Sequence, residues 1–586
     1  MKSLHIGRRT TVFVRAILAL IMIIGGFGAH RAWAQNTAAI SGSIQDAQKE
    51  LIPGANVTAT RVETSESFQT VSDRSGFYAF PVLVPGHYKI AVNKDGFAPQ
   101  VKSGIQIFTG QTSSVNFTLD LGQVQEQVEV SGDVVQLQTA TSSITDEIEN
   151  TTITNYPLLD RRATQLSRLN GFVIGGGTGS GSYFAIAGGR GGNANYTVDG
   201  GTTQNLLQGV PTQMFDLPVD SLQEFSLSVS DYSADLGRSG GGYVQMSTKS
   251  GTNQLHGSSY FYYRSQDLQA IPYFAPNNPL TGKPINAPLQ YKLFGASIGG
   301  PIKKDKTFFF FTYEGKVETL NNQVTISVPT APERKGDFSA ISTPVIDPNT
   351  GKQAVYNGTL NVLPPSELDP YGVQLASYYP LPNVPGAAIN SNNYSANDPI
   401  PELYNDYVAR IDQKFSDKDS VYGRFLAQPD HENTSDVYPT AGTDSYGVLS
   451  HNYYYNPSAT WNHIFRPTLL NEARATFSFR QALSIGHGVN STVATQLALP
   501  GVNPIFFPGV TVTGLAAIGN TSQQRRLQTP ILSNDYADNL SWQRANHQFK
   551  FGADYRTSAD GDLYSPSGGG IFTFTPAGAS TNTAAG

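Results

Sequence analysis

Two glycine-rich stretches of this sequence match motifs that carry out chemistry in other proteins. Gly189 to Ala194 fits the dinucleotide pattern G-x-G-x-x-A, and Gly237 to Gly241 fits the G-x-S-x-G pattern of a nucleophile elbow. The first pattern binds a cofactor only within a βαβ unit, and the second needs a helix directly after its serine. The sequence predicts a turn at the first stretch and a strand after the second. We therefore expect neither stretch to be catalytic or to bind a cofactor.

Other common sources of catalysis are absent from the sequence. Its 586 residues include no cysteine, which excludes disulfides, thiolate metal sites and cysteine nucleophiles. No histidine begins an H-x-x-E or H-E-x-x-H motif, and no phosphate-binding G-x-x-x-x-G-K-[ST] loop occurs. The net charge of -6 argues against nucleic acid as a partner. We predict a protein that is not an enzyme and needs no metal or cofactor.

The composition favours a β-rich membrane protein of several domains. Charged residues make up 14% of the chain, against about a quarter in ordinary globular proteins, while Tyr, Phe and Gly number 29, 31 and 58. Such a composition suits strands with one lipid face and long polar loops. Beyond the leader, no stretch is long and apolar enough for a spanning helix, so the chain can cross a membrane only as a barrel.

Residues 1–34 have the pattern of a secretory signal peptide. Basic residues, including Arg8 and Arg9, precede an apolar run from Ala16 to Gly28, and Ala32 to Ala34 is an A-x-A cleavage site. The run is shorter than the ~20 residues of a spanning helix, although an uncleaved anchor is the alternative. The two arginines also fit the twin-arginine route, but that route carries folded cargo, which an outer-membrane barrel cannot be. We expect general secretion and cleavage near Ala34.

Residues 35–122 predict a small β-sandwich. Short strand-like runs are separated by turn signals such as Pro53-Gly54 and Pro85-Gly86, at the spacing of about 8–12 residues that is typical of sandwiches. The expected strands are Ala39–Ile44, Asn56–Arg61, Ser67–Ser72, Phe77–Val82, His87–Asn93 and Ser114–Leu119.

Residues 133–250 predict a mixed α+β domain. Leucine spacing in Tyr156–Leu169 indicates a helix, and the Gly/Ser run from Gly175 to Ser182 indicates a mobile loop. The expected strands lie before the turn signal Asp199-Gly200, around Glu224, and at Tyr243–Thr248.

Residues 251–586 predict antiparallel strands of a transmembrane barrel. Short turns join some strands and long polar loops join others, the longest between Glu318 and Tyr404, as in outer-membrane barrels. The expected strands are 256–264, 291–299, 307–317, 405–415, 420–428, 452–463, 470–480, 533–543 and 549–556.

These strands have one apolar and one polar face. In Leu470–Arg480, alanine and phenylalanine alternate with charged and hydroxyl residues. Because Lys or Arg on the lipid face near the midplane costs about 2–4 kcal/mol, the polar face must look into the lumen. A soluble half-buried sheet shows the same alternation, but aromatic runs such as Phe308–Phe311 favour a membrane. The candidate lumen residues are Arg410, Asp412, Glu472, Arg474 and Arg480.

The middle of the chain resembles the plug domain of TonB-dependent outer-membrane transporters. The matching pieces, in order, are Val198 to Gly200, Asp220 to Phe225 and Tyr232 to Gly242. Phe294–Gly315 and Asn405–Phe425 look like barrel segments of the Oar-like group, which carries a carboxypeptidase-regulatory-like domain before its plug. The implied fold is mainly β: a signal peptide, a small transthyretin-like β-sandwich, an α+β plug and the first part of a transmembrane antiparallel β-barrel. The implied domains are 1–34, 35–122, a linker at 123–132, the plug at 133–250 and the barrel portion at 251–586.

The sandwich region itself resembles the carboxypeptidase-regulatory-like domain. Its motifs are I-x-G-x-I-x-D from Ile40, P-G-A-x-V from Pro53, S-D-x-x-G-x-Y-x-F from Ser72 and P-G-x-Y from Pro85. These residues are mostly turn glycines and inward aromatics, so the match implies a fold and no chemistry. A rigid periplasmic spacer and a glycan-binding module are the two roles left open.

The transporter resemblance also assigns roles to single residues. The V-x-V-x-G element before the plug resembles a TonB box, which pairs with TonB through its backbone; an ordinary linker or a last sandwich strand is the alternative. Its candidate contacts are Gln127, Val128, Glu129 and Val130. The family's motif arginine is replaced by Ala187 here, with Arg190 as a stand-in, and we expect the glycine cluster to pack against the barrel wall. The plug-motif residues are Arg190, Asp199, Gly200, Glu224, Gly237, Arg238 and Gly241.

The resemblance to TonB-dependent transporters implies an importer in a Gram-negative outer membrane, driven by TonB and its inner-membrane energising complex. Its partners would be TonB, the lipid bilayer and an unknown extracellular ligand, for which the aromatic, Asn-rich loops suit a glycan or oligosaccharide. The alternative is a surface adhesion or assembly protein that uses the loop at 318–404. Nine expected strands are fewer than the about 22 of the family's barrels, so we expect an N-terminal part of a longer protein.

Overall fold

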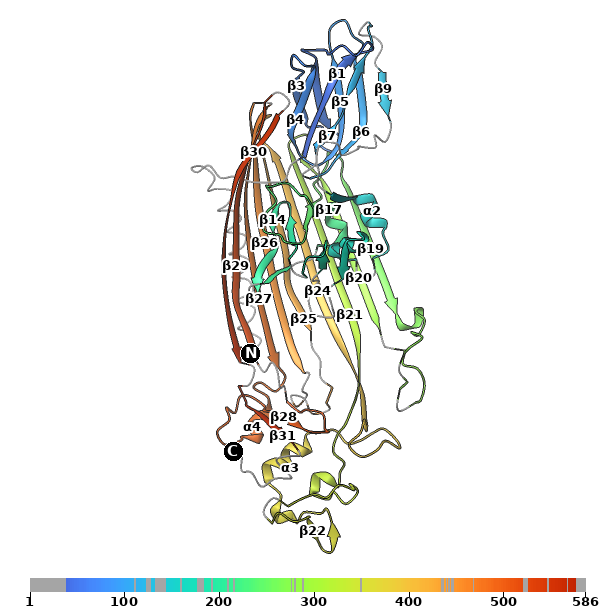
Figure 1. The fold of residues 1–586 in the computed structure, drawn as a ribbon, viewed down its shortest axis with the longest axis vertical. Coiled ribbons are helices and arrows are strands. Elements are labelled where there is room, and N and C mark those ends of the chain that lie inside the picture. Colours follow the sequence, from blue (N-terminus) through green and yellow to red (C-terminus); the bar gives the residue numbers. More distant parts are fainter. Residues whose placement is uncertain are drawn as a thin grey trace.

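The computed structural model places a sandwich, an inserted domain and a curved nine-stranded sheet along one long axis (Figure 1). The sandwich lies at one end of the sheet, loops with α3 (Pro370–Ser377) and α4 (Thr492–Leu497) lie at the other end, and the inserted domain lies against the sheet between them. The described residues are 38–109, 112–122, 128–131, 144–158, 161–175, 184–190, 193–207, 210–213, 217–275, 277–278, 281–286, 289–347, 350–433, 437–438, 440, 443, 447–466, 468–519, 525–544, 547–565 and 568–575. Within these ranges no helix has the length and apolar character needed to cross a membrane. The expected mainly-β fold is confirmed, whereas the leader at 1–34 lies outside the described residues.

The sandwich consists of two facing sheets. The strands are β1 (Ala38–Asp46), β2 (Asn56–Arg61), β3 (Ser67–Val71), β4 (Phe77–Leu83), β5 (Gly86–Asn93), β6 (Gln100–Ile107), β7 (Thr112–Ser114), β8 (Phe117–Leu119) and β9 (Val128–Ser131). One sheet has the order β4-β1-β7, with β8 also on β1, and the other has the order β3-β2-β5-β6-β9. Alternate residues of β2 and β5 are buried, as expected for strands with one face on the core. The core includes Ile40, Val57, Tyr88 and Ile105.

The inserted domain, called the plug below, has a five-stranded sheet of order β10-β17-β18-β13-β14. Its strands are β10 (Ile144–Glu149), β13 (Asn195–Val198), β14 (Gly201–Thr202), β17 (Leu222–Ser230) and β18 (Tyr243–Thr248). All six residues of β18 are buried, because this strand lies in the middle of the sheet between β17 and β13. Three buried barrel side chains join the plug core: Val408, Leu426 and Tyr454.

The helix expected at Tyr156–Leu169 is wrong in its position and type. An α-helix, α2 (Asn150–Asn155), ends before this stretch, and a 3₁₀ helix, η1 (Ala163–Leu169), occupies only its last part. Tyr156 is extended, with φ -71° and ψ 132°. Pro157 follows it, and a residue before proline avoids the α conformation, so the helix cannot continue. The loop expected at Gly175–Ser182 lies outside the described residues from 176 onward.

The large sheet is antiparallel throughout, and its strands are neighbours in chain order. All nine expected strands are present, and most are longer than expected because pairing continues into the polar loop segments. Their bounds are β19 (His256–Ser265), β20 (Gln290–Lys303), β21 (Thr307–Ile326), β24 (Tyr394–Lys414), β25 (Asp419–Asn433), β26 (Val448–Arg466), β27 (Leu469–Gly486), β29 (Arg525–Arg544) and β30 (His547–Ser565). The loop expected at 318–404 therefore shrinks to 327–393.

The two faces of the sheet have different chemistry. The convex face exposes apolar side chains, among them Ile298, Phe311 and Phe551. Aromatic rings follow each other across the strands in two groups: Phe294, Tyr313 and Tyr407 towards the long loops, and Trp461, His463, Phe465, Trp542 and Phe549 towards the short turns. Two aromatic girdles around an apolar band are typical of transmembrane barrels.

The long loops form a separate packed cluster at the end away from the sandwich. Its buried residues come from three loops and include Val328, Tyr379, Val437, Leu497 and Phe507. The hydroxyls of Tyr379 and Tyr438 donate to the carbonyls of Ala516 and Ala517 at 2.8 and 2.7 Å, which joins the loops to one another. The loops therefore present an ordered surface.

Candidate functional site

The turn at Asp199-Gly200 places a carboxylate at the centre of the contact between plug and barrel wall. It joins β13 to β14, with Val198 paired to Gly201. Both turn residues have positive φ, 47° and 73°, as a two-residue type I′ hairpin requires, and Asp-Gly is a favoured pair for such a turn. The Asp199 side chain is fully buried, at 0% exposure.

Asp199 binds partners from both domains. The backbone N–H and the hydroxyl of Thr248, on the neighbouring plug strand, donate to its two oxygens at 2.9 and 2.8 Å. From the wall, Arg424 Nε lies 2.9 Å from Oδ2 and Arg410 Nη1 lies 3.5 Å from Oδ1. The carboxylate is therefore an ion-pair partner for two wall arginines.

Arg410 and Arg424 lie directly opposite each other on β24 and β25. Like charges opposite each other on paired strands repel, and both side chains are buried. Asp412 offsets the positive charge of Arg410, which donates to the Asp412 carboxylate at 2.8 to 3.1 Å. Arg424 donates to Asn456 of β26 at 2.9 Å and to the carbonyl of Val198 in the plug at 3.2 Å. Asp199 is thus the carboxylate paired with both arginines.

A second polar contact lies on the far strands of the sheet. The backbone N–H of Thr202 donates to Asp535 of β29 at 3.2 Å. The same carboxylate lies 3.7 Å from Arg474 of β27 and 3.6 Å from Arg556 of β30. Gly201 approaches Thr476 so closely that a Cβ at this position would collide with it. The hairpin at β13–β14 is therefore one part of the plug that contacts these strands.

A third contact involves the loop before β18. Asp235 lies 3.4 Å from Lys550 of β30. Burial raises the pKa of Asp235, but the charge of Lys550 and local hydrogen bonds outweigh burial and hold this pKa below its ordinary value. The contact therefore favours a charged Asp235.

Glu224 connects the plug to the sandwich instead of the wall. Thr109, two residues after β6, donates to Glu224 from its backbone N–H at 3.0 Å and also from its hydroxyl. Ser247 of β18 donates to the same oxygen at 2.9 Å. Burial raises the pKa of Glu224, while these hydrogen bonds oppose the rise.

The glycine cluster does not pack against the barrel wall as expected. Gly241 lies against Gly189 and Ile186 of the plug, where a Cβ would be 3.4 Å from the Gly189 Cα and from the Ile186 carbonyl oxygen, and Gly237 has open space around it. The reason is that β18 lies inside the plug sheet, so its leading residues meet other plug residues. Arg190 and Arg238 are both exposed, and neither joins the described contacts around Asp199.

The candidate TonB-contact segment forms β9. Val128, Glu129 and Val130 pair in parallel with Gln100, Val101 and Lys102 of β6, whereas Gln127 lies outside the described residues. The segment is therefore a last strand of the sandwich sheet, which was one of the two alternatives for it.

The remaining candidate lumen residues lie on the concave face of β27. Glu472 and Arg474 are buried, and Arg480 is half-buried and opposite Tyr454. The sequence did not single out Arg424 or Asp535 as site residues. The alternation of β25 could have placed Arg424 inward, but only the strand register shows that it faces Arg410.

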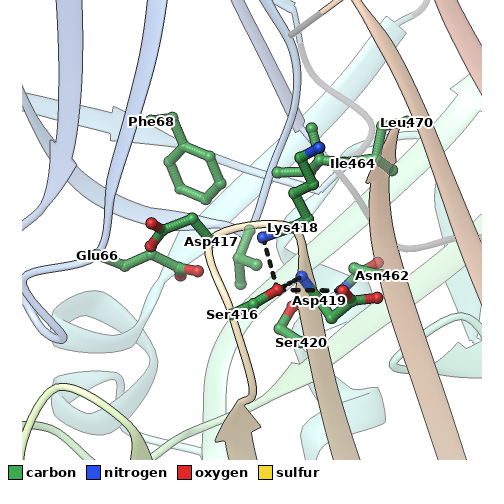
Figure 2. A pocket seen from close by; sticks show the side chains of 11 residues that line it. Glu66, Phe68, Ser416, Asp417, Lys418, Asp419, Ser420, Asn462, Ile464 and Leu470 are labelled. Atoms are coloured by element: carbon green, nitrogen blue, oxygen red, sulfur yellow. Dashed lines mark hydrogen bonds between the residues drawn. The ribbon is translucent and has the colours of Figure 1, made fainter. Parts of the chain in front are cut away.

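A small cleft separates the sandwich from the turn between β24 and β25. Figure 2 shows Glu66 and Phe68 on the sandwich side and Ser416 to Ser420 on the turn side. The turn is held by the Ser416 hydroxyl, which accepts from the N–H groups of Lys418 and Asp419 at 3.1 Å. Burial raises the pKa of Glu66, while the charges of Arg61 and Lys414 lower it. The cleft lies where the sandwich meets the wall, and its lining residues include no nucleophile–base pair.

Taken together, these residues can hold a plug in a barrel, and they show no catalytic arrangement. Within the described ranges, no three His, Asp or Glu side chains are grouped to hold a metal ion. Asp199 and Asp535 make ion pairs and hydrogen bonds across the plug–wall contact, while Val408, Leu426 and Tyr454 of the wall add apolar contacts to the plug core. Water can replace the polar partners when the plug moves, so these groups need not stay unpaired.

Comparisons with known proteins agree with this architecture. A family model described as an outer membrane beta barrel domain matches residues 247–586, more than half of the chain, and a carboxypeptidase regulatory-like domain model matches residues 39–120. The chain is 28% identical over 304 residues to the TonB-dependent transporter Oar of Myxococcus xanthus. This match covers 50% of the chain and 28% of Oar, so the chain spans well under half the length of that relative.

Two solved structures are similar at low sequence identity. The outer membrane transporter YddB of Escherichia coli is 12% identical with a TM-score of 0.47, over 71% of this chain and 48% of YddB. A mutant of the ferric enterobactin receptor PfeA of Pseudomonas aeruginosa, in complex with enterobactin, is 10% identical with a TM-score of 0.39, over 72% of this chain and 50% of PfeA.

The family matches confirm the resemblance found in the sequence. Oar is described as a transporter, which agrees with the expectation of a protein that is not an enzyme and gives the adhesion alternative no support. The chain therefore belongs to the outer-membrane β-barrel family, as an Oar-like homologue of TonB-dependent transporters with a place in the outer membrane of a Gram-negative cell envelope.

Proposed function

We propose that this protein imports an extracellular ligand through a TonB-driven rearrangement of its plug. The observation that carries the proposal is the buried polar contact of Asp199 with Arg410 and Arg424. It holds the plug in one position at rest, because breaking a buried ion pair costs about 3–5 kcal/mol. Mechanical work done by TonB can supply this free energy, whereas thermal motion rarely breaks the contact.

In this proposal TonB contacts the protein at residues 127–130. The segment precedes the plug, and its residues Val128–Val130 lie in the short strand β9, the last strand of its sheet among the described residues; peptides pair with such edge strands by strand addition. The ligand is proposed to be a glycan or oligosaccharide. Exposed aromatic rings in the loop regions, such as Tyr273, Phe274 and Tyr356, offer stacking faces to sugars.

Deletion of residues 123–132 in the full-length protein tests this function. We expect binding of the purified TonB periplasmic domain to be lost, together with uptake of fluorescently labelled oligosaccharides by whole cells. A matched control replaces an equally long piece of the loop at 327–393 with Gly and Ser and should still bind TonB. Undiminished uptake by the deletion variant, at equal amounts in the outer membrane, would show that this segment does not drive transport.

A further inference from the structure

Among the described strands, β9 is paired along one edge, and its other edge, called the open edge below, has no described partner. It is the last strand of the sheet β3-β2-β5-β6-β9 and pairs in parallel with β6, from Gln100 opposite Val128 to Ser103 opposite Ser131. In Figure 1, β9 lies at the outer side of the sandwich, beyond β6. Among the strands that the structure describes, β6 is its one partner. The backbone groups that point away from β6 are therefore available to a further strand.

The strand β6 also leads directly to the plug. It ends at Ile107, and Thr109 then donates two hydrogen bonds to Glu224 of β17. The Thr109 hydroxyl lies 3.0 Å from that of Ser247 on β18, and all three residues are buried. One strand of the sandwich thus touches the TonB-contact segment along its length and the plug sheet just beyond its end.

We propose, on the basis of the TonB-driven uptake proposed above, that the sandwich presents β9 to TonB as a ready-formed strand. TonB adds a strand of its own to the open edge of β9, and β9 stays on β6. The sandwich sheet then continues into TonB, and a pull by TonB acts on the sandwich as one body. The pull reaches the plug along the backbone after Ser131 and also through β6 and the contact of Thr109 with Glu224. The sandwich is neither a passive spacer nor a sugar-binding module in this arrangement.

Addition to the open edge is favoured over exchange of partners for two reasons. A strand that is already extended loses little conformational freedom when TonB binds, whereas a free segment must be ordered first. Exchange would also remove the ladder bonds between β6 and β9 and leave the amides of β6 without partners. Strand addition needs neither step.

A disulfide between β6 and β9 separates the two possibilities. Ser103 and Ser131 are direct partners, so S103C with S131C differs from the natural residues by only one atom at each position. The 586 residues contain no other cysteine, so within them this pair has no competing partner. We expect the oxidised full-length protein to bind the purified TonB periplasmic domain with an affinity within about twofold of the reduced protein. A loss of tenfold or more on oxidation would mean that β9 must leave β6, and the proposal would be wrong.

The matched control pairs S103C with V128C. These positions are three residues out of register, roughly 10 Å apart along the strand, and too far for a disulfide. Oxidation should leave TonB binding by this variant unchanged, so any change seen only in the register-matched pair comes from the cross-link.

Hydrogen exchange of the natural full-length protein gives a second test without any substitution. When the TonB domain is added, the amides of Gln100–Ile107 should stay protected and those of β9 should gain protection. Faster exchange in Gln100–Ile107 would overturn strand addition. Absence of TonB binding by the natural protein would instead overturn the proposed function, and with it this inference, so the two failures are distinguishable.

Discussion

Asp199 carries one negative charge and lies between two arginines that face each other across neighbouring strands. Its hydrogen bonds to Thr248 fix the carboxylate in the plug, so the charge is presented to the wall in a defined orientation. A buried anion between two buried cations contributes more to the plug's position than a surface ion pair, which contributes about 0–1 kcal/mol.

Replacement of Asp199 by Asn tests this contact. The substitution keeps the size of the side chain and removes the charge, which leaves Arg424 without its ion-pair partner. We expect the free energy that holds the plug in the barrel to fall by about 3–5 kcal/mol. The measurement is urea-induced release of the plug, followed by the rate of protease cleavage in the plug.

The matched control is Asp231→Asn, which makes the same change at an exposed plug residue that also has positive φ. It should leave release unchanged. A double variant, Asp199→Asn with Arg424→Met, should lose less stability than the two single changes added together, because both remove the same ion pair. Full additivity would contradict the assigned contact.

Sequence reasoning identified some of these residues and missed others for clear physical reasons. The Asp-Gly turn signal and the strand alternation are local, so Asp199, Arg410 and Arg474 could be placed from the sequence. The pairing of Arg410 with Arg424 depends on strand register, and the contact of Asp535 with Thr202 joins residues more than 300 positions apart. Such contacts are set by tertiary packing, which local patterns do not contain.

At the scale of elements, the loop between β2 and β3 docks the sandwich onto the wall. Asn253, at the start of the barrel, connects the loop to the wall. Its backbone N–H donates to the carbonyl of Glu63 in the loop at 3.1 Å, and its side chain donates to Asp305 in the first short turn of the wall at 2.7 Å. The carboxylate of Glu63, in this loop, lies 2.9 and 2.8 Å from the backbone N–H and Nδ1 of His87 on β5. The loop is therefore held in shape by a titratable pair.

This pair predicts a pH-dependent stability of the sandwich. The hydrogen bond to Glu63 raises the pKa of His87. The stabilisation of the fold by protonated His87 is therefore complete below the ordinary imidazole pKa and is lost as the pH rises through the raised pKa. Burial raises the pKa of Glu63, but His87 and Arg61 outweigh it and lower this pKa, so its contribution is lost only as the pH falls through the lowered value. The pair should contribute most between about pH 4.5 and 6.5.

Scanning calorimetry of the full-length protein checks this expectation. Between pH 6 and pH 8 the natural protein should lose more stability than a His87→Gln variant, by up to about 1 kcal/mol because the pair is partly exposed. Lys89→Gln, an exposed change on the same strand, should follow the natural protein. If the His87→Gln variant lost as much stability between pH 6 and pH 8 as the natural protein, the Glu63–His87 pair would be excluded as the source of the pH dependence.

The elements could be predicted where one local pattern decides them. Strong alternation and short turns predicted all nine long strands, and β2 and β18 have the predicted bounds. The strand β6 was not predicted, and it has a glycine in its interior, a residue that is depleted in strands. Gly104 has φ 76° and lies beside a register shift in the pairing with β5, so it forms an irregularity within the strand.

At the scale of the whole molecule, the aromatic girdles define where the bilayer lies. On β24, Tyr407 belongs to the girdle near the long loops, and Phe415 follows the strand at the short-turn end. Ile411 lies halfway between them and is 53% exposed on the convex face. Its side chain is therefore expected near the middle of the lipid.

An arginine at Ile411 should destabilise the barrel by about 2–4 kcal/mol, because a charge near the midplane must leave water. The same change at Phe415, which is 67% exposed at the end of the strand, should cost only about 0–1 kcal/mol. Unfolding in lipid vesicles measures both values. Equal costs at the two positions would show that the band between the girdles is not the lipid-facing region.

The facing arginines on β24 and β25 also have a consequence for biogenesis. If β24 and β25 paired without the plug, the guanidinium groups of Arg410 and Arg424 would face each other without the Asp199 carboxylate between them. That step becomes favourable once the Asp-Gly hairpin is already in place. We therefore expect this part of the wall to close more readily when the plug hairpin already lies against it.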